Sequence, residues 1–209
     1  MTTTVNTAAP AYINAADNVL TDGEAWVPLS TTVLTGAVNS FTLESSTGAN
    51  DWSQYMDLVL IINARNDYGD VANAPAFTIT ARFNDDGGTN YPWQRFRTDG
   101  STAVAQSIPN TVGAVVGYAV AINDADVFNG SIAYFSDINS GKYKSIFSQS
   151  ANATNDSSYN SEYTVTATWE NVAAITKMVI YSDSGSGSYD FCADSRFDLF
   201  GILPRMVTA

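Results

Sequence analysis

The sequence predicts an all-β protein, an antiparallel β-sandwich of jelly-roll type that follows an extended N-terminal arm. Only 14% of the 209 residues are charged, while 12% are aromatic. Short runs rich in Val, Ile, Thr, Tyr and Phe recur along the chain, and such side chains suit a pleated surface. Clusters of Asn, Asp, Gly and Ser separate these runs and are typical of turns. No segment shows the periodicity of a helix of several turns.

Two regions are expected. Residues 1–25 are small, polar and weakly patterned, and we interpret them as an extended arm that becomes ordered only on a neighbour. Residues 26–209 contain no linker and no short repeat, and their length is typical of one large sandwich domain.

The strands are expected in quick succession from Trp26 onward. The run 26–31 contains Pro28, which indicates a sheet edge or a strand start, because proline lacks the N–H that a ladder needs. The continuous apolar run 58–62 predicts a strand covered on both faces, although a short buried helix has the same signature. Residues 77–83 alternate between apolar and polar side chains, as in a half-buried strand. Further strands are predicted at 40–45, 114–122, 130–136, 143–149, 163–169, 177–182 and 196–202.

The strand at 77–83 leads into the least ordinary stretch of the chain, Asn-Asp-Asp-Gly-Gly at 84–88. Asp-Gly is a preferred corner of two-residue hairpins because both residues accept positive φ. We therefore expect a β-hairpin with its corner at residues 86–87. The side chains near this turn that could meet a ligand or a neighbouring subunit are Asp85, Asp86, Asn90, Tyr91 and Trp93.

Two turns carry the oxygen atoms that calcium prefers. One is the stretch 84–88, and the other offers Asp124, Asp126 and Asn129. Neither has the spacing of an EF-hand loop. Hairpin geometry accounts for both turns without a metal, so we expect neither a metal nor a cofactor.

Aromatic side chains offer another kind of site, because ring faces stack on the C–H surfaces of sugars. Trp52, Tyr55, Tyr91 and Trp93 are the candidates. In a sandwich, however, most Trp and Phe side chains fill the core. Tyr91 and Trp93 alternate beside the turn, so we expect at least one of them to be exposed.

Composition argues against most enzyme classes. The chain has no histidine, which removes Ser-His-Asp and Cys-His catalysis and histidine-ligated zinc. It has no P-loop and no GxGxxG motif. A glycosidase needs only two facing carboxylates, and 21 acidic residues permit that pair, but the four glutamates lie beside no recognisable aromatic cleft. We expect no enzymatic activity.

Charge and apolar patterning also indicate which partners and which location to expect. A net charge of −12 repels phosphate backbones, so nucleic acid is not an expected partner. The single cysteine, Cys192, allows no intrachain disulfide and is expected to be a small buried residue. Residues 1–20 lack a basic start and an apolar run, and no stretch approaches the ~18 apolar residues of a membrane span. We expect synthesis in a cytoplasm and no contact with a membrane.

Five motifs follow one another along the chain: QYMDLVLIINAR (54–65), ITARFNDDGGTNY (79–91), GKYKSIFS (141–148), TWENVAAITKMVIYS (168–182) and ADSRFDLFGI (193–202). In this order they resemble a β-rich module that recurs in virion proteins of tailed bacteriophages, and the resemblance covers residues 26–203. The pattern departs from the module at Phe200, where tyrosine is usual, at the residues before Ser195, and at the more acidic turn at 84–88.

The resemblance implies a structural or adhesive part of a virion, typically homotrimeric and without enzymatic activity. The leading hypothesis is a capsid decoration, or cement, protein on the outer surface of the head, with its arm on the major capsid protein. The absence of a coiled-coil shaft favours the head over a fibre. The alternatives are a tail-fibre or receptor-binding protein that contacts a host glycan, and a stand-alone carbohydrate-binding or lytic module. Release of virions by lysis would bring the protein outside without a secretion signal.

Overall fold

The structure is a computed structural model that describes residues 26–67, 76–98, 101–120, 127–152, 160–182 and 189–203. The predicted arm, residues 1–25, lies outside this part of the chain. The described residues form twelve strands and two single-turn 3-10 helices. No described helix is long and apolar enough to cross a membrane. The elements are β1 (Trp26–Val33), β2 (Ser40–Glu44), η1 (Gly48–Asn50), η2 (Trp52–Gln54), β3 (Asp57–Ala64), β4 (Ala76–Phe83), β5 (Trp93–Thr98), β6 (Ala103–Ile108), β7 (Ala114–Val120), β8 (Asn129–Ser136), β9 (Lys144–Asn152), β10 (Ser161–Trp169), β11 (Lys177–Ser182) and β12 (Arg196–Ile202).

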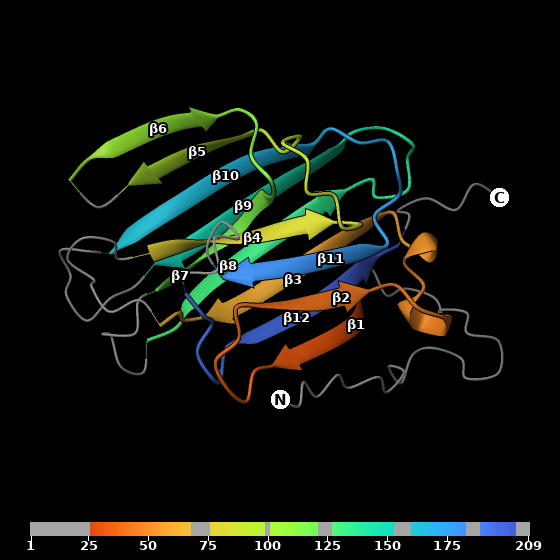
Figure 1. The fold of residues 1–209 in the computed structure, drawn as a ribbon, viewed down its shortest axis with the longest axis horizontal. Coiled ribbons are helices and arrows are strands. Elements are labelled where there is room, and N and C mark those ends of the chain that lie inside the picture. The colour runs from red at the N-terminus through yellow and green to blue at the C-terminus, as the bar shows by residue number, and fades with distance from the viewer. Residues whose placement is uncertain are drawn as a thin grey trace.

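The strands form two antiparallel sheets that pack face to face, which confirms the all-β sandwich (Figure 1). The larger sheet has the order β1-β12-β3-β8-β9-β10-β5-β6, and the smaller has the order β2-β11-β4-β7. The chain alternates between the sheets from β1 to β4, whereas β5–β6 and β8–β9–β10 are neighbours within the larger sheet. In Figure 1, β5 and β6 lie beyond the border of the smaller sheet.

All ten strands predicted from the sequence have counterparts, and β5 and β6 are additional. The prediction for the first strand is confirmed, because β1 is an edge strand. Its register with β12 shifts between Pro28 and Ser30, as expected where proline cannot donate a hydrogen bond. The apolar run 58–62 lies in β3 and is a strand rather than a buried helix. Its predicted coverage on both faces holds for Val59, which is buried, but is wrong for Ile61, which is 38% exposed.

The main core lies between the sheets and is built by strand alternation. In β4, for example, Ile79, Ala81 and Phe83 point inward and are fully buried. A second, smaller cluster joins β7 to β10 and consists of Val115, Tyr118, Tyr163 and Val165, with Trp93 packed against it.

One close approach in the core requires glycine. A Cβ atom built on Gly201, in β12, would lie 2.5 Å from ring atoms of Tyr55. The Tyr55 ring is itself 2% exposed, and its hydroxyl donates to the Ala49 carbonyl at 2.6 Å. The ring is therefore fixed, and a larger residue at position 201 would displace it.

Candidate functional site

Residues 84–92 cross from the smaller sheet to the larger, so the predicted β-hairpin is wrong. The preceding strand, β4, pairs with β11 and β7, whereas the following strand, β5, pairs with β10 and β6. A tight turn is present, but its corner lies at Asn84 and Asp85, with φ of 50° and 58°. The N–H of Asp86 closes this turn by donating to the Phe83 carbonyl at 2.9 Å. Asn and Asp tolerate positive φ better than most residues, and they take the place expected for Asp86 and Gly87.

The corner residues bind the turn to the start of β11. The side-chain amide of Asn84 donates to the Ala174 carbonyl at 2.7 Å. Its oxygen accepts from the backbone N–H groups of Thr176 and Lys177, at 3.0 and 3.1 Å. Asp85 forms an exposed ion pair with Lys177 at 2.8 Å. These contacts identify Asn84 and Asp85 as structural residues of the turn.

The carboxylate of Asp86 is the organising group of this segment. It accepts from the buried indole N–H of Trp169 at 2.8 Å, and also binds two groups of its own loop, the amide of Asn90 at 2.8 Å and the N–H of Gly88 at 3.0 Å. Burial raises the pKa of Asp86, but hydrogen bonds from Trp169, Gly88, Asn90 and Asn171 outweigh that effect and place its pKa below the usual value. The carboxylate oxygens are therefore engaged within the protein.

The two aromatic candidates beside this turn have different environments. Tyr91 is fully buried, and burial raises the pKa of its hydroxyl. That hydroxyl donates to the Asp86 carbonyl at 3.0 Å and accepts from the N–H of Phe83 at 3.2 Å. Trp93, at the start of β5, is half-buried and packs against both core clusters. Of this pair, only Trp93 keeps part of its surface exposed.

The remaining predicted site residues do not converge on a ligand site. Trp52 and Tyr55 are 1% and 2% exposed and belong to the core, so neither is a sugar platform. Asp124 and Asp126 lie outside the described residues. Asn129 is buried, and its amide donates to the side chain of Asn152. Within the described ranges, no group of three or more acidic, cysteine or histidine side chains is placed to hold a metal ion.

The structure instead reveals an open face on the larger sheet, turned away from the core. We define the open face by four hydrophobic side chains on β3, β8, β9 and β5: Ile61, Ile132, Phe147 and Phe96. They are 38%, 39%, 43% and 51% exposed. The strand registers place Ile61, Ile132 and Phe96 in one cross-strand row and Phe147 in the adjacent row.

The open face is shallow and nearly uncharged. Two hollows of about 500 Å³ each lie on it, one along β3, β8 and β9 and the other along β10, β5 and β6. Between β3 and β5 its exposed polar side chains are mainly Thr and Gln, such as Gln149 and Thr166, and the exposed charged group is Glu162. Exposed apolar surface with this neutral surround is typical of a protein contact.

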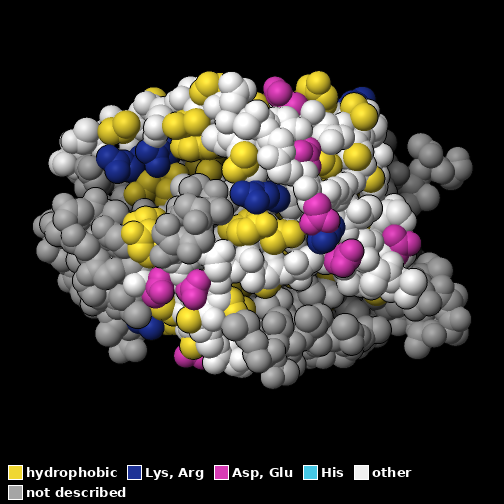
Figure 2. Space-filling view, in the orientation of Figure 1, with side chains coloured by type: hydrophobic (Ala, Val, Ile, Leu, Met, Phe, Trp, Pro, Cys, Tyr) yellow, Lys and Arg dark blue, Asp and Glu magenta, His cyan; other side chains and the backbone are white. Residues whose placement is uncertain are grey.

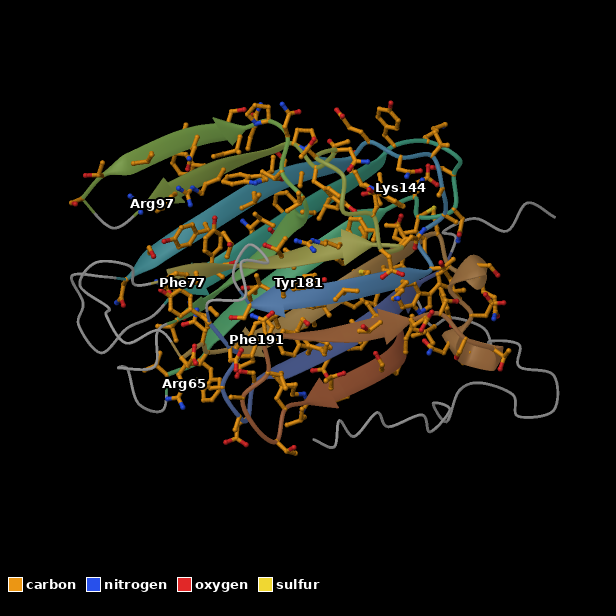
Figure 3. The ribbon with its side chains drawn as sticks, in the orientation of Figure 1. Arg65, Phe77, Arg97, Lys144, Tyr181 and Phe191 are labelled. Atoms are coloured by element: carbon orange, nitrogen blue, oxygen red, sulfur yellow. The ribbon has the colours of Figure 1, made fainter. Side chains whose placement is uncertain are left out.

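A second notable group lies on the opposite side of β5, facing the second core cluster. Arg95 donates to the Tyr118 hydroxyl at 3.2 Å and to the Gln106 side chain. The ring of Tyr118 stacks on that of Tyr163 at 3.8 Å between centroids. Figure 3 shows Arg97 beside β5, and Figure 2 shows basic side chains next to hydrophobic atoms in the same part of the molecule. We call Arg95 and Arg97 the arginine pair.

Neither the open face nor the arginine pair was predicted. The strands that carry Ile61, Ile132 and Phe147 were expected, but their pattern does not show which face stays uncovered, and β5, which carries Phe96 and both arginines, was missed. The alternation within 93–98, where Trp93, Arg95 and Arg97 share one face, is typical of a strand. The charges on that face make the pattern difficult to recognise, because they replace the apolar residues that a strand usually turns inward.

Comparison with protein-family models and with curated proteins gives no match for this chain.

Proposed function

We propose that the chain is a structural protein of a bacteriophage virion, a capsid decoration protein on the outer surface of the head. The observation that carries this proposal is the open face. Ile61, Ile132 and Phe147 lie on adjacent strands, and Phe96 lies on the same face beyond Gln149 and Thr164. This sheet surface has hardly any charge. Burying apolar surface stabilises a contact by roughly 25 cal/mol per Å², so such a face favours attachment to another protein. The proposed partners are the major capsid protein and further virion proteins.

The strand order supports a jelly roll as the finer description of the fold. Four consecutive strands of the larger sheet, β1-β12-β3-β8, and the four strands of the smaller sheet, β2-β11-β4-β7, together form an eight-stranded framework. These eight strands follow the order of two interlocked Greek keys. We infer that β5–β6 and β9–β10 are hairpins added to that framework, and that they enlarge one sheet to create the open face.

The burial of three of the four predicted sugar-stacking residues favours the head over the tail. A tail-fibre or receptor-binding protein, or a stand-alone carbohydrate-binding module, needs accessible rings on which a sugar can stack. Trp52, Tyr55 and Tyr91 are core residues, each at most 2% exposed. The aromatic side chains that define the open face, Phe96 and Phe147, lack the polar tip that sugar-binding Tyr and Trp residues supply. Host-glycan adhesion remains the second candidate because Trp93 is partly exposed.

Quantitative mass spectrometry of purified virions tests the placement. A decoration protein is expected at hundreds of copies per particle, whereas a few dozen copies or fewer would contradict the head assignment and indicate the tail. Absence from virions would refute the proposal as a whole.

A variant of the open face tests the contact itself. Charges introduced by the double substitution Ile132→Lys and Phe147→Lys should abolish binding to particles that lack the protein. Val172→Lys is the matched control, because Val172 is 59% exposed and lies in the loop between β10 and β11 rather than on a strand of this face. Equal binding by the double variant and the control, with unchanged melting temperatures, would exclude the open face as the attachment surface.

A further inference from the structure

The edge strand β6 differs from the other sheet edges because nothing in its sequence protects it. Proteins block sheet edges with proline, charge, irregular pairing or a covering segment. The opposite edge, β1, contains Pro28 and a register shift. In the smaller sheet, β2 has five residues and ends in Glu44, and the end of β7 is bridged by Arg65 to Val120. In contrast, β6 (Ala103–Ile108) has no charge, no proline and a regular register with β5.

The backbone of β6 is consequently a template for another strand. It pairs with β5 on one side, and no described strand pairs with its other side. Its residues alternate between exposed and half-buried along the whole strand. An extended segment from another chain could add here and gain main-chain hydrogen bonds, as in other cases of strand addition.

The arginine pair lies on the strand next to this edge and has unused donors. The Nε atoms of Arg95 and Arg97 are both buried without a hydrogen-bond partner. Arg97 forms no ion pair with the described carboxylates, and the ion pairs among the described residues are Lys177–Asp85 and Arg196–Asp198. Guanidinium groups bind carboxylates through planar, bidentate hydrogen bonds. Arg97 therefore offers its half-buried guanidinium to a carboxylate beside the free edge, and Arg95, whose terminal nitrogens are bound to Tyr118 and Gln106, adds positive charge next to it.

We propose that β6 and the arginine pair bind the acidic stretch 16–25 (ADNVLTDGEA) of a second copy of this chain. Charge complementarity supports this occupant, because the stretch carries Asp17, Asp22 and Glu24 and no basic residue. Ten extended residues span about 33 Å, which exceeds the length of roughly 20 Å expected for a six-residue strand. Strand addition supplies the affinity, and the arginine pair selects an acidic sequence.

The position of the stretch in the fold supports the same occupant. Residues 16–25 directly precede β1, which lies at the edge of the larger sheet opposite β6. A neighbour that turns its β1 edge toward β6 therefore brings this stretch to the site. Each copy then donates its acidic stretch beside β1 and accepts the stretch of a neighbour at β6, at the opposite edge of the larger sheet. Such a head-to-tail contact closes into a ring when the rotation between copies permits, as the homotrimer expected from the resemblance would require.

Charge reversal tests the proposal by sedimentation velocity on the purified full-length chain. The wild type should form a closed oligomer that dissociates at high salt, because salt screens exposed charges. Arg97→Glu should weaken association at least tenfold, and so should the triple variant D17K/D22K/E24K. Combining all four substitutions should restore association, which a purely structural role of Arg97 would not produce. Thr166→Lys, on a strand paired on both sides, is the control for an added charge and should leave association unchanged.

A wild-type chain that stays monomeric at high concentration would overturn the proposal. Association that resists Arg97→Glu, or that the combined variant fails to restore, would overturn it equally. An edge variant, Ala105→Lys, tests the strand-addition step separately and should weaken association without lowering the melting temperature. The experiment requires no virion, so its outcome is independent of the placement proposed above.

Discussion

Removing the carboxylate of Asp86 should destabilise the protein far more than removing the adjacent carboxylate of Asp85. In Asp86→Ala, the buried indole N–H of Trp169 loses its acceptor, which costs about 1–3 kcal/mol. The loss of the bonds from Asn90 and Gly88 adds to this cost, although water can replace part of them. We expect a total of about 3 kcal/mol, because hydrogen bonds to charged groups contribute roughly 1.5–3 kcal/mol each and are not additive.

Urea denaturation and thermal melting measure this effect. For a domain of this size, about 3 kcal/mol corresponds to a decrease in melting temperature of roughly 6–12 °C. Asp85→Ala is the matched control, because Asp85 forms only an exposed ion pair, whose contribution is about 0–1 kcal/mol. Equal free energies of unfolding for the two variants would refute the view that Asp86 organises the crossing between the sheets.

The pH dependence of Asp86→Asn provides an independent test of the same residue. The folded-state pKa of Asp86 is lowered, so the unfolded chain binds more protons in the acid range. The contribution of Asp86 to stability is therefore present above its unfolded pKa, about 3.9, and is lost as the pH falls through the folded value. The difference in stability between wild type and Asp86→Asn should shrink below about pH 4. A difference that stays constant to pH 2 would contradict this assignment.

Three further predictions concern the core and the turns. Gly201→Ala should destabilise the protein by about 1–3 kcal/mol through overpacking against Tyr55, whereas Gly36→Ala, where a Cβ meets nothing within 4 Å, should have little effect in the same urea titration. Cys192 is buried, and burial raises the pKa of its thiol, so a thiol reagent should label it in urea but not in the native protein; rapid native labelling would contradict its burial. Calcium should produce neither heat in calorimetry nor a change in melting temperature, and a clear binding isotherm would reinstate the acidic turns as a metal site.

The fold was predictable because most strands alternate cleanly or are continuously apolar. Residues 77–83 show this best, since their inward side chains on β4 are those that the pattern indicates. In contrast, β5 and β6 were missed. The mixed sequence WQRFRT places arginines on the partly covered face and Phe96 on the open one, because β5 lies beyond the smaller sheet. The rule that apolar residues point inward fails there.

The turn at 84–88 shows a different limit of sequence reasoning. Turn chemistry indicated a tight corner beside Asp86, and the structure has one, shifted to Asn84 and Asp85. Local chemistry does not report which sheet receives the next strand, so the hairpin prediction failed. The role of Asp86 likewise depends on Trp169, 83 positions away in sequence, and no local pattern connects the two.

A cryo-electron microscopy reconstruction of the virion tests the central claim most directly. We expect this β-sandwich to occupy the outer surface of the head, with Ile61, Ile132, Phe147 and Phe96 against another virion protein. Density for the sandwich at the tail, or on the head with these four side chains facing solvent, would contradict it.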